Sequence, residues 1–153
     1  MTKTEKILAA YERFGAAIAA VPDRRAETLH RTSAGAREFV SGVRARDPKI
    51  TTSQASAGLE QGLRETPELI QGVAPEWRAA VAKAFHDALT QEYPEFLALD
   101  ALRLRKVLAR GRIRSEAEYH RVRHEIDVVE GEPGRQAELK ELYGLIDVFD
   151  ARA

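Results

Sequence analysis

The fold is decided by residues 94–153, which read PEFLALDALRLRKVLARGRIRSEAEYHRVRHEIDVVEGEPGRQAELKELYGLIDVFDARA. Two segments near the end of this stretch carry apolar residues at the same spacing, i, i+3, i+7 and i+10, which places four side chains on one stripe of an α-helix. Residues 131–134, with the sequence GEPG, separate the two segments. A connection this short predicts that the second helix runs back antiparallel to the first, so that each stripe buries the other. The stripes are Tyr119, Val122, Ile126 and Val129, and Leu139, Leu142, Ile146 and Phe149.

The segment before these two helices, residues 94–110, is apolar on more than one face, which is typical of a helix in the centre of a bundle. We expect it to end at Gly111, because glycine accepts the left-handed backbone that closes many helices. Ser115 and Glu118 have the spacing of a capping box, in which the serine oxygen accepts a free backbone N–H at the start of the next helix. Residues 94–153 are therefore predicted to form three mutually packed helices whose polar faces point into water.

The rest of the chain also has helical periodicity, and no alternating run of β-branched and aromatic residues predicts a strand. Helices are predicted over residues 3–20, 24–46 and 75–92, with Asp23 as the cap of the second. Between them, a hydroxyl in residues 51–53 is expected to cap a short helix. Thr66 and Pro67 are expected to begin another helix, which ends near Gly72. Residues 48–75 are rich in Gly, Thr, Ser and Gln, so we expect them to be the most mobile part of the chain, and the sequence specifies neither their conformation nor their role.

These elements predict an all-α protein, namely a single-domain bundle of six or seven helices closed by the C-terminal antiparallel helical hairpin. At 153 residues the chain has the size of one domain, with a conceivable subdivision into residues 1–93 and 94–153.

Charge and cysteine content narrow the classes of function. Lys plus Arg equals Asp plus Glu, 24 each, so no net charge attracts nucleic acid or lipid. The absence of cysteine excludes disulfides, thiolate zinc sites and cysteine catalysis, and it fits a reducing cytoplasm. No run of about eighteen apolar residues could span a membrane, and the charged start, MTKTEK, does not have the apolar core of a signal peptide. We therefore expect a cytoplasmic protein with no membrane partner.

The most specific polar feature lies in the helix predicted after Ser115. Four potential metal ligands follow one another at i, i+4, i+8 and i+11, which places them within about 80° on one helical face. Two histidines at i and i+4 can share a divalent metal, and carboxylates can complete the site. We expect this face to be exposed, where the same residues could equally form ordinary intrahelical pairs and hold no cofactor. The four residues are Glu116, His120, His124 and Asp127.

Residues 103–114 contain six cations and no acid. Some of them share a helical face and could neutralise phosphates or contact an acidic partner. The alternative is structural, because cations near a helix C-terminus offset the helix dipole and can pair with the acids that open the next helix. No aromatic residue in this segment could stack on bases, so nucleic acid is not the expected partner. The candidate patch comprises Arg103, Lys106, Arg110, Arg112 and Arg114.

A short motif offers an enzymatic alternative. An arginine precedes a histidine by five or six positions twice, as Arg25 with His30 and Arg114 with His120. This spacing resembles the motif of the all-helical HEPN ribonucleases, in which four to six residues separate the two. The resemblance implies a ribonuclease in which Arg114 would hold the phosphate and His120 would move a proton, both in one cleft beside the basic run. The polar residue that commonly follows the arginine in that family is replaced by Ala26 after Arg25.

Other catalytic signatures are absent, since the sequence has no Gly-rich phosphate loop, nucleophile elbow or His-Glu-x-x-His zinc motif. A neutral, cysteine-free helical chain without clustered catalytic groups offers surfaces for recognition rather than chemistry. The sequence therefore favours a small bacterial-type, non-catalytic module that binds another protein or itself, as an immunity protein, an antitoxin or a regulatory partner does. This hypothesis predicts a contiguous exposed apolar patch or a stable oligomer.

Overall fold

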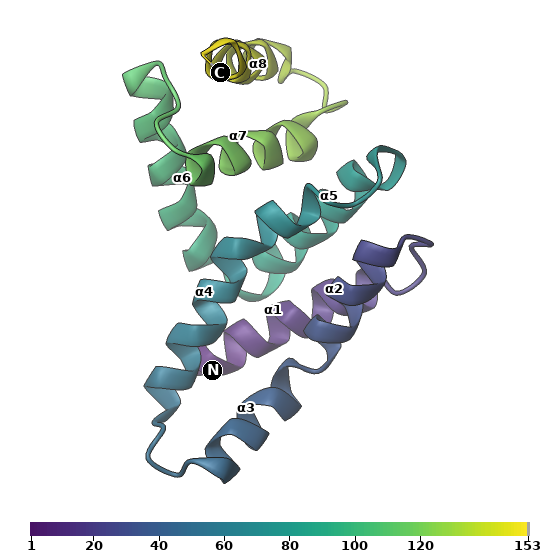
Figure 1. Cartoon of the computed structure of the whole chain (residues 1–153), viewed down its shortest axis with the longest axis vertical. Helices are drawn as coiled ribbons and strands as arrows, with labels where there is room; N and C mark the ends of the chain where they lie inside the picture. Colours follow the sequence, from purple (N-terminus) through teal and green to yellow (C-terminus); the bar gives the residue numbers. More distant parts are fainter. Residues whose placement is uncertain (153) are drawn as a thin grey trace.

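Residues 1–152 are described by a computed structural model, in which they form eight α-helices and no strand (Figure 1). The all-α prediction is therefore confirmed, with more helices than the six or seven expected. The helices are α1 (Lys3–Ala17), α2 (Arg24–Ala34), α3 (Ala36–Arg46), α4 (Thr52–Ile70), α5 (Pro75–Glu92), α6 (Pro94–Arg110), α7 (Glu116–Val129) and α8 (Gln136–Ala151).

A break at Gly35 divides the predicted helix over residues 24–46 into α2 and α3. Gly35 has φ −91° and ψ 5°, so the backbone leaves the helical path there, and α3 continues from the end of α2 after a bend (Figure 1). Glycine is a poor residue for a helix interior because its backbone is the most flexible. Gly15 of α1 and the small residue Ser33 of α2 let the two helices approach closely. A side chain at position 15 would place its Cβ only 3.2 Å from Ser33 Cβ.

The region over residues 48–75 is more regular than the sequence indicates. α4 passes without interruption through Thr66 and Pro67, so the predicted helix start at that dipeptide is wrong. Both residues are buried, and Thr66 Oγ1 donates to the Gly62 carbonyl oxygen at 2.7 Å. Proline removes one backbone hydrogen bond from a helix interior, and here the burial of this part of α4 offsets that loss.

Capping side chains set the helix ends at the predicted places. Asp23 Oδ1 accepts from Ala26 N at 3.0 Å, and its Oδ2 accepts from Ala74 N at 3.1 Å, which ties the start of α2 to the start of α5. Thr51 and Gln54 form a reciprocal capping box at α4. Ser115 Oγ accepts from Glu118 N, and Gly111 ends α6 with φ 78°, as predicted.

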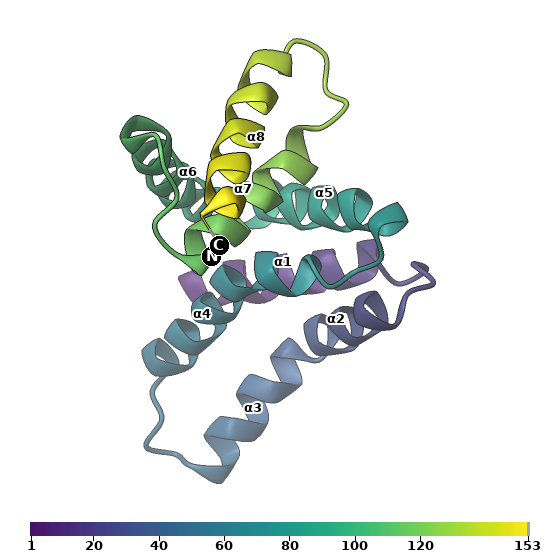
Figure 2. The same cartoon turned by 45° about the horizontal axis from the view of Figure 1, so that its top comes forward.

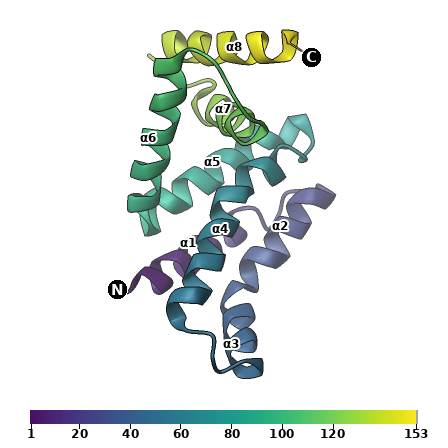
Figure 3. The ribbon, with the colours of Figure 1, turned by 60° about the vertical axis from the view of Figure 1, so that its left-hand side comes forward.

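Two helices organise the packing, α1 in the N-terminal half and α7 in the C-terminal half. α1 packs on α2, α4 and α5, whereas α7 packs on α4, α5, α6 and α8. α4 and α5 thus contact both central helices, and the buried apolar side chains form one connected cluster that draws on residues 1–93 and 94–153. The molecule is elongated, with α3 at one end and α8 at the other (Figures 1 and 3).

The two C-terminal helices pack on each other through the predicted stripes. Tyr119 of α7 stacks on Phe149 of α8, with 5.0 Å between ring centroids. The helix axes cross, because α8 is seen along its axis in Figure 1, where α7 lies across the view, and the reverse holds in Figure 3. Crossed packing leaves α8 covering only part of α7.

Within residues 1–152, no helix combines the length and the apolar composition needed to cross a bilayer.

Candidate functional site

The histidine face of α7 is covered by protein, and the prediction that it points into water is wrong. His124 is only 5% exposed, and its ring meets the edge of Phe85 at a centroid distance of 5.8 Å. Burial lowers the pKa of His124 well below its ordinary value, and the charges of Arg121 and His86 act in the same direction. The physical reason is that α4 and α5 lie on this side of α7, so both of its faces are packed.

The four candidate metal ligands do not come together. Glu116 is exposed at the start of α7, whereas Asp127 is half-buried and accepts from Gln71 Nε2 at 3.0 Å. Burial raises the pKa of the Asp127 carboxyl, and the hydrogen bond from Gln71 opposes that rise. Among residues 1–152, no three His, Asp or Glu side chains lie close enough to hold a metal ion.

A cavity of about 420 Å³ lies where α4, α5, α6 and α7 meet, and the two histidines line it. Its walls are largely apolar, with Phe85 and Leu89 from α5 and Phe96 and Val107 from α6. The polar and charged lining comes from all four helices. It comprises Gln61, Arg64, Glu65, Glu68, His86, Asp100, Arg103, Lys106, Arg110, Glu118, His120, Arg121 and His124.

Three of the lining side chains contain buried nitrogen atoms that have no hydrogen-bond partner in the described part of the chain. These atoms are His120 Nδ1, His124 Nδ1, and Nε and Nη1 of Arg121. An unpaired buried polar group costs about 1–3 kcal/mol, and native proteins contain few of them. All such atoms found in residues 1–152 belong to these three residues at one cavity, and Arg121 Nε has an ion pair with Asp100.

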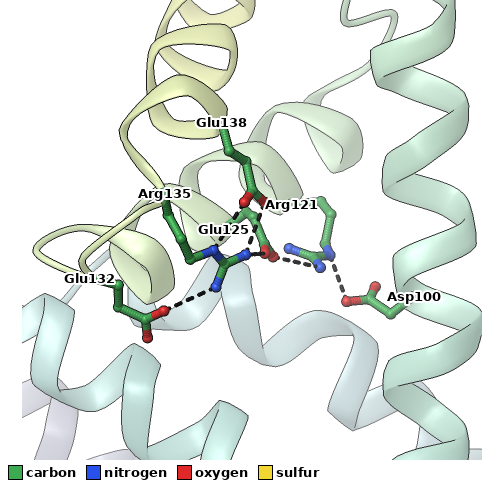
Figure 4. Close-up of polar contacts among 6 residues, drawn as sticks. All are labelled: Asp100, Arg121, Glu125, Glu132, Arg135 and Glu138. Carbon is green, nitrogen blue, oxygen red and sulfur yellow. Dashed lines mark hydrogen bonds and ion pairs between the residues drawn. The ribbon is translucent and has the colours of Figure 1, made fainter.

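Arg121 is held in place by a chain of ion pairs (Figure 4). Its Nε lies 2.6 Å from Asp100 Oδ2 of α6, and its Nη2 lies 2.9 Å from Glu125 Oε2 of α7. This contact is a close ion pair. Arg135 continues the chain, with Glu125 at 3.8 Å and with Glu138 at 2.9 Å. The guanidinium of Arg121 is therefore fixed between the half-buried Asp100 and the buried Glu125. Its Nη1 has no hydrogen-bond partner within residues 1–152.

The pKa of Asp100 reflects these surroundings. Burial raises the pKa of this carboxyl above its ordinary value, the positive charge of Arg121 opposes the rise, and the negative charge of Glu125 adds to it. The net direction is upward, so the ion pair with Arg121 compensates only part of the cost of burying the charge.

The predicted basic patch is divided by the fold. Arg103, Lys106 and Arg110 line the cavity from α6, whereas Arg112 and Arg114 do not. Arg110 is bound by both oxygens of Glu118, at 2.8 and 3.1 Å, which is the pairing expected from the structural alternative. No carboxylate within residues 1–152 lies within 4.0 Å of the charged groups of Arg103 or Lys106.

The cavity between α4, α5, α6 and α7 does not bring Arg114 and His120 together. His120 lines the cavity, with its Nε2 3.7 Å from Glu68 Oε1, but the exposed Arg114 is not part of the lining. Arg114 contributes its backbone N–H to Glu118 Oε1. In the other pair, His30 Nδ1 donates to the Gly15 carbonyl oxygen at 2.7 Å, while Arg25 is exposed.

A second concave surface lies between α3 and the N-terminal half of α4, which meet at their outer ends through residues 47–51 (Figure 2). This groove has a volume of about 760 Å³ and is mostly apolar. Only Ala36 is buried in α3, and Phe39 is 62% exposed. The apolar lining comprises Tyr11, Ala36, Phe39, Val40, Val43, Ile50, Ala55 and Leu59.

No protein family, curated protein or solved structure shows a significant match to this chain. A function can therefore be inferred only from the geometry and chemistry of this chain's own residues.

The sequence pattern identified His120, His124 and the α6 cations. It did not identify Asp100 or Arg121, whose side chains form the polar side of the cavity. The available signal was Asp100, a single carboxylate in the apolar run FLALDAL.

Proposed function

We propose that the protein is a non-catalytic interaction module whose α3–α4 groove binds an acidic amphipathic helix of a partner protein. The observation that carries this proposal is α3 itself, an eleven-residue helix whose apolar face is only partly covered by residues 1–152 and leaves Phe39 62% exposed. By binding a partner protein without catalysing a reaction, the protein would act as a regulatory partner, as an immunity protein or an antitoxin does.

The exposed face of α3 is unusual in energetic terms. Isolated helices of this length are marginal in water, and most helices are stabilised by burying an apolar stripe. In α3 that stripe contains Phe39, Val40 and Val43, of which Phe39 is exposed and the valines are only half-buried. A helix lying in the groove would bury all three side chains together with Ile50 and Leu59, as in the helix-in-groove mode of recognition.

Charge around the groove favours an acidic partner. Residues 31–50 contain five Arg or Lys side chains and two carboxylates. Arg31 lines the groove, and Arg44, Arg46 and Lys49 are exposed on α3 and the loop that follows. Within residues 1–152, Arg37 is the one of these five side chains that forms ion pairs, with Glu5 and Glu12 of α1. Positive charge at the rim of an apolar groove attracts a helix that carries acids beside its apolar stripe.

The test is a binding measurement with a synthetic helical peptide of about 18 residues that has Leu on one face and Glu on the other. We expect fluorescence anisotropy to show saturable binding that weakens with salt, and no binding of the same peptide with Lys in place of Glu. Val43→Asp should reduce the affinity at least tenfold, because it places an unpaired carboxylate in the groove. Val148→Asp is the matched control, since Val148 is exposed on α8 at the other end of the molecule.

Equal binding by the Val43→Asp and Val148→Asp proteins, or equal affinity for the Glu and Lys peptides, would contradict the proposal. Sedimentation of the protein alone tests the other occupant of the groove. A dimer that Val43→Asp dissociates would show that a second copy of this chain fills the groove, and the acidic-helix proposal would then be wrong.

A further inference from the structure

We propose that the cavity between α4, α5, α6 and α7 binds a small organic anion that has a carboxylate group and an apolar body. This site is separate from the α3–α4 groove and shares no lining residue with it.

The size and walls of the cavity fit the apolar part of such a ligand. A volume of about 420 Å³ lies within the range of small-molecule sites, which are typically about 300–1,000 Å³ and mostly apolar with a few placed polar groups. Phe85 and Phe96 provide aromatic surface, and Leu89, Leu97 and Val107 complete the wall. Flat aromatic or branched aliphatic groups gain dispersion contacts in such a space and lose their water shell.

Arg121 is the group that identifies the ligand as an anion or a strong hydrogen-bond acceptor. Its guanidinium can only donate, and Nη1 has no acceptor within residues 1–152. The ion pairs to Asp100 and Glu125 hold the guanidinium in place at the cavity. The Arg121 side chain therefore loses little conformational freedom when a ligand binds. A carboxylate offers two oxygens in the geometry that an arginine fork accepts.

The two histidines add direction, and His124 does so as a neutral ring because burial lowers its pKa. His124 is more than nine-tenths buried, lines the cavity and has no partner at Nδ1, and the same atom of His120 is also unpartnered. A buried neutral imidazole can donate one hydrogen bond and accept another. His124 therefore supplies a specific contact to a ligand, and the unpaired Nδ1 of His120 offers a second one.

The charge balance at the cavity favours one negative charge on the ligand. Asp100 and Glu118 are already paired with Arg121 and Arg110. Arg64, Arg103 and Lys106 also line the cavity and have no carboxylate within 4.0 Å in residues 1–152, so three unpaired positive charges face the two carboxylates of α4. Glu65 and Glu68 line the cavity from α4 and would repel a doubly charged group. A carboxylate monoanion is therefore preferred to a dianionic phosphate monoester.

Calorimetric titration with three compounds of the same apolar body tests the proposal, namely 2-naphthoate, 2-naphthyl phosphate and 2-naphthalenemethanol. We expect one molecule of 2-naphthoate to bind per chain, about tenfold or more tighter than the other two. Arg103→Gln and Lys106→Gln should each weaken 2-naphthoate binding about tenfold and leave binding of 2-naphthalenemethanol unchanged. Both side chains are exposed, so these variants should fold. Arg105→Gln is the matched control on the same helix, because Arg105 is exposed and does not line the cavity.

The location of binding is tested by two further measurements. The ring proton signals of His124 and His120 should shift on addition of 2-naphthoate, and the Val43→Asp protein should bind it as well as the wild type. Failure of 2-naphthoate to bind, equal binding of the alcohol, tighter binding of the phosphate, or equal effects of Arg103→Gln and Arg105→Gln would each overturn the proposal. Loss of binding in the Val43→Asp protein would place the compound in the groove and also overturn it.

Discussion

At the scale of the residue, His124 links the stability of the fold to pH. The ring is buried against Phe85, and burial together with the nearby Arg121 and His86 lowers its pKa well below the ordinary value of 6.5. The unfolded chain therefore binds a proton at His124 over a pH range in which the folded chain does not. Stability that is present above the unfolded pKa is lost as pH falls towards the folded pKa.

We predict that the free energy of unfolding decreases by about 1.4 kcal/mol per pH unit through this group as pH falls below about 6.5. His124→Leu should remove this slope, since leucine fills the site without a titratable group. Asp100 and Asp127, whose pKa values are raised, bind protons first in the folded state and act in the opposite direction at lower pH. Urea titrations of both proteins between pH 8 and pH 5 measure the difference, and parallel curves for the two would show that His124 does not titrate as described.

The position of His124 also shows how far single residues can be predicted from the sequence. Helical periodicity correctly separates the Tyr119 stripe from the histidine face, and the capping residues Asp23 and Ser115 act where the local pattern places them. Periodicity alone identifies the faces of a helix but not how many are covered. The burial of His124 depends on α4 and α5, which arrive from distant parts of the chain and leave no local signal in α7.

At the scale of the element, α3 is the helix least supported by the rest of the molecule. Its only buried residue is Ala36, and its link to α1 is Arg37, whose guanidinium lies 3.2 Å from Glu5 and 2.8 Å from Glu12. The side chain of Arg37 is exposed, so these ion pairs are open to screening by salt. Periodicity predicted the helical character of residues 36–46, but the turn at Gly35 and the exposure of Phe39 depend on tertiary packing.

We predict that amide hydrogen exchange in α3 is faster than in α1 or α7, and that Arg37→Gln increases it further while exchange in α1 changes little. Arg44→Gln is the control, because Arg44 lies on the same helix and has no carboxylate within 4.0 Å in the described structure. High salt should bring the wild type close to the Arg37→Gln protein. Exchange in α3 as slow as in α7 would mean that the α3–α4 groove is rigid and that its partner need not stabilise the helix.

At the scale of the whole molecule, the arrangement around two central helices determines whether the chain unfolds as one unit. α1 and α7 belong to opposite sides of the conceivable boundary at residue 93, but α4 and α5 pack on both. The edge contact between Phe14 of α1 and Phe85 of α5, and that between Phe85 and His124 of α7, form a continuous path through the core. The fold class follows from periodicity and composition, whereas this sharing of α4 and α5 is a long-range property that no local pattern specifies.

We predict a single cooperative unfolding transition in which substitutions at either central helix have the same kind of effect. Ile7 of α1 and Ile126 of α7 are both buried, so Ile7→Ala and Ile126→Ala form a matched pair. Each should lower the free energy of unfolding by about 2–5 kcal/mol through lost burial and the cavity left behind. Because the core is continuous, far-UV circular dichroism and the fluorescence of Trp77 should give coincident transitions in the wild type and in both variants. Two transitions, with Ile7→Ala shifting one and Ile126→Ala the other, would instead show that residues 1–93 and 94–153 unfold separately, and that the cavity walls from α4, α5, α6 and α7 are contributed by two independent units.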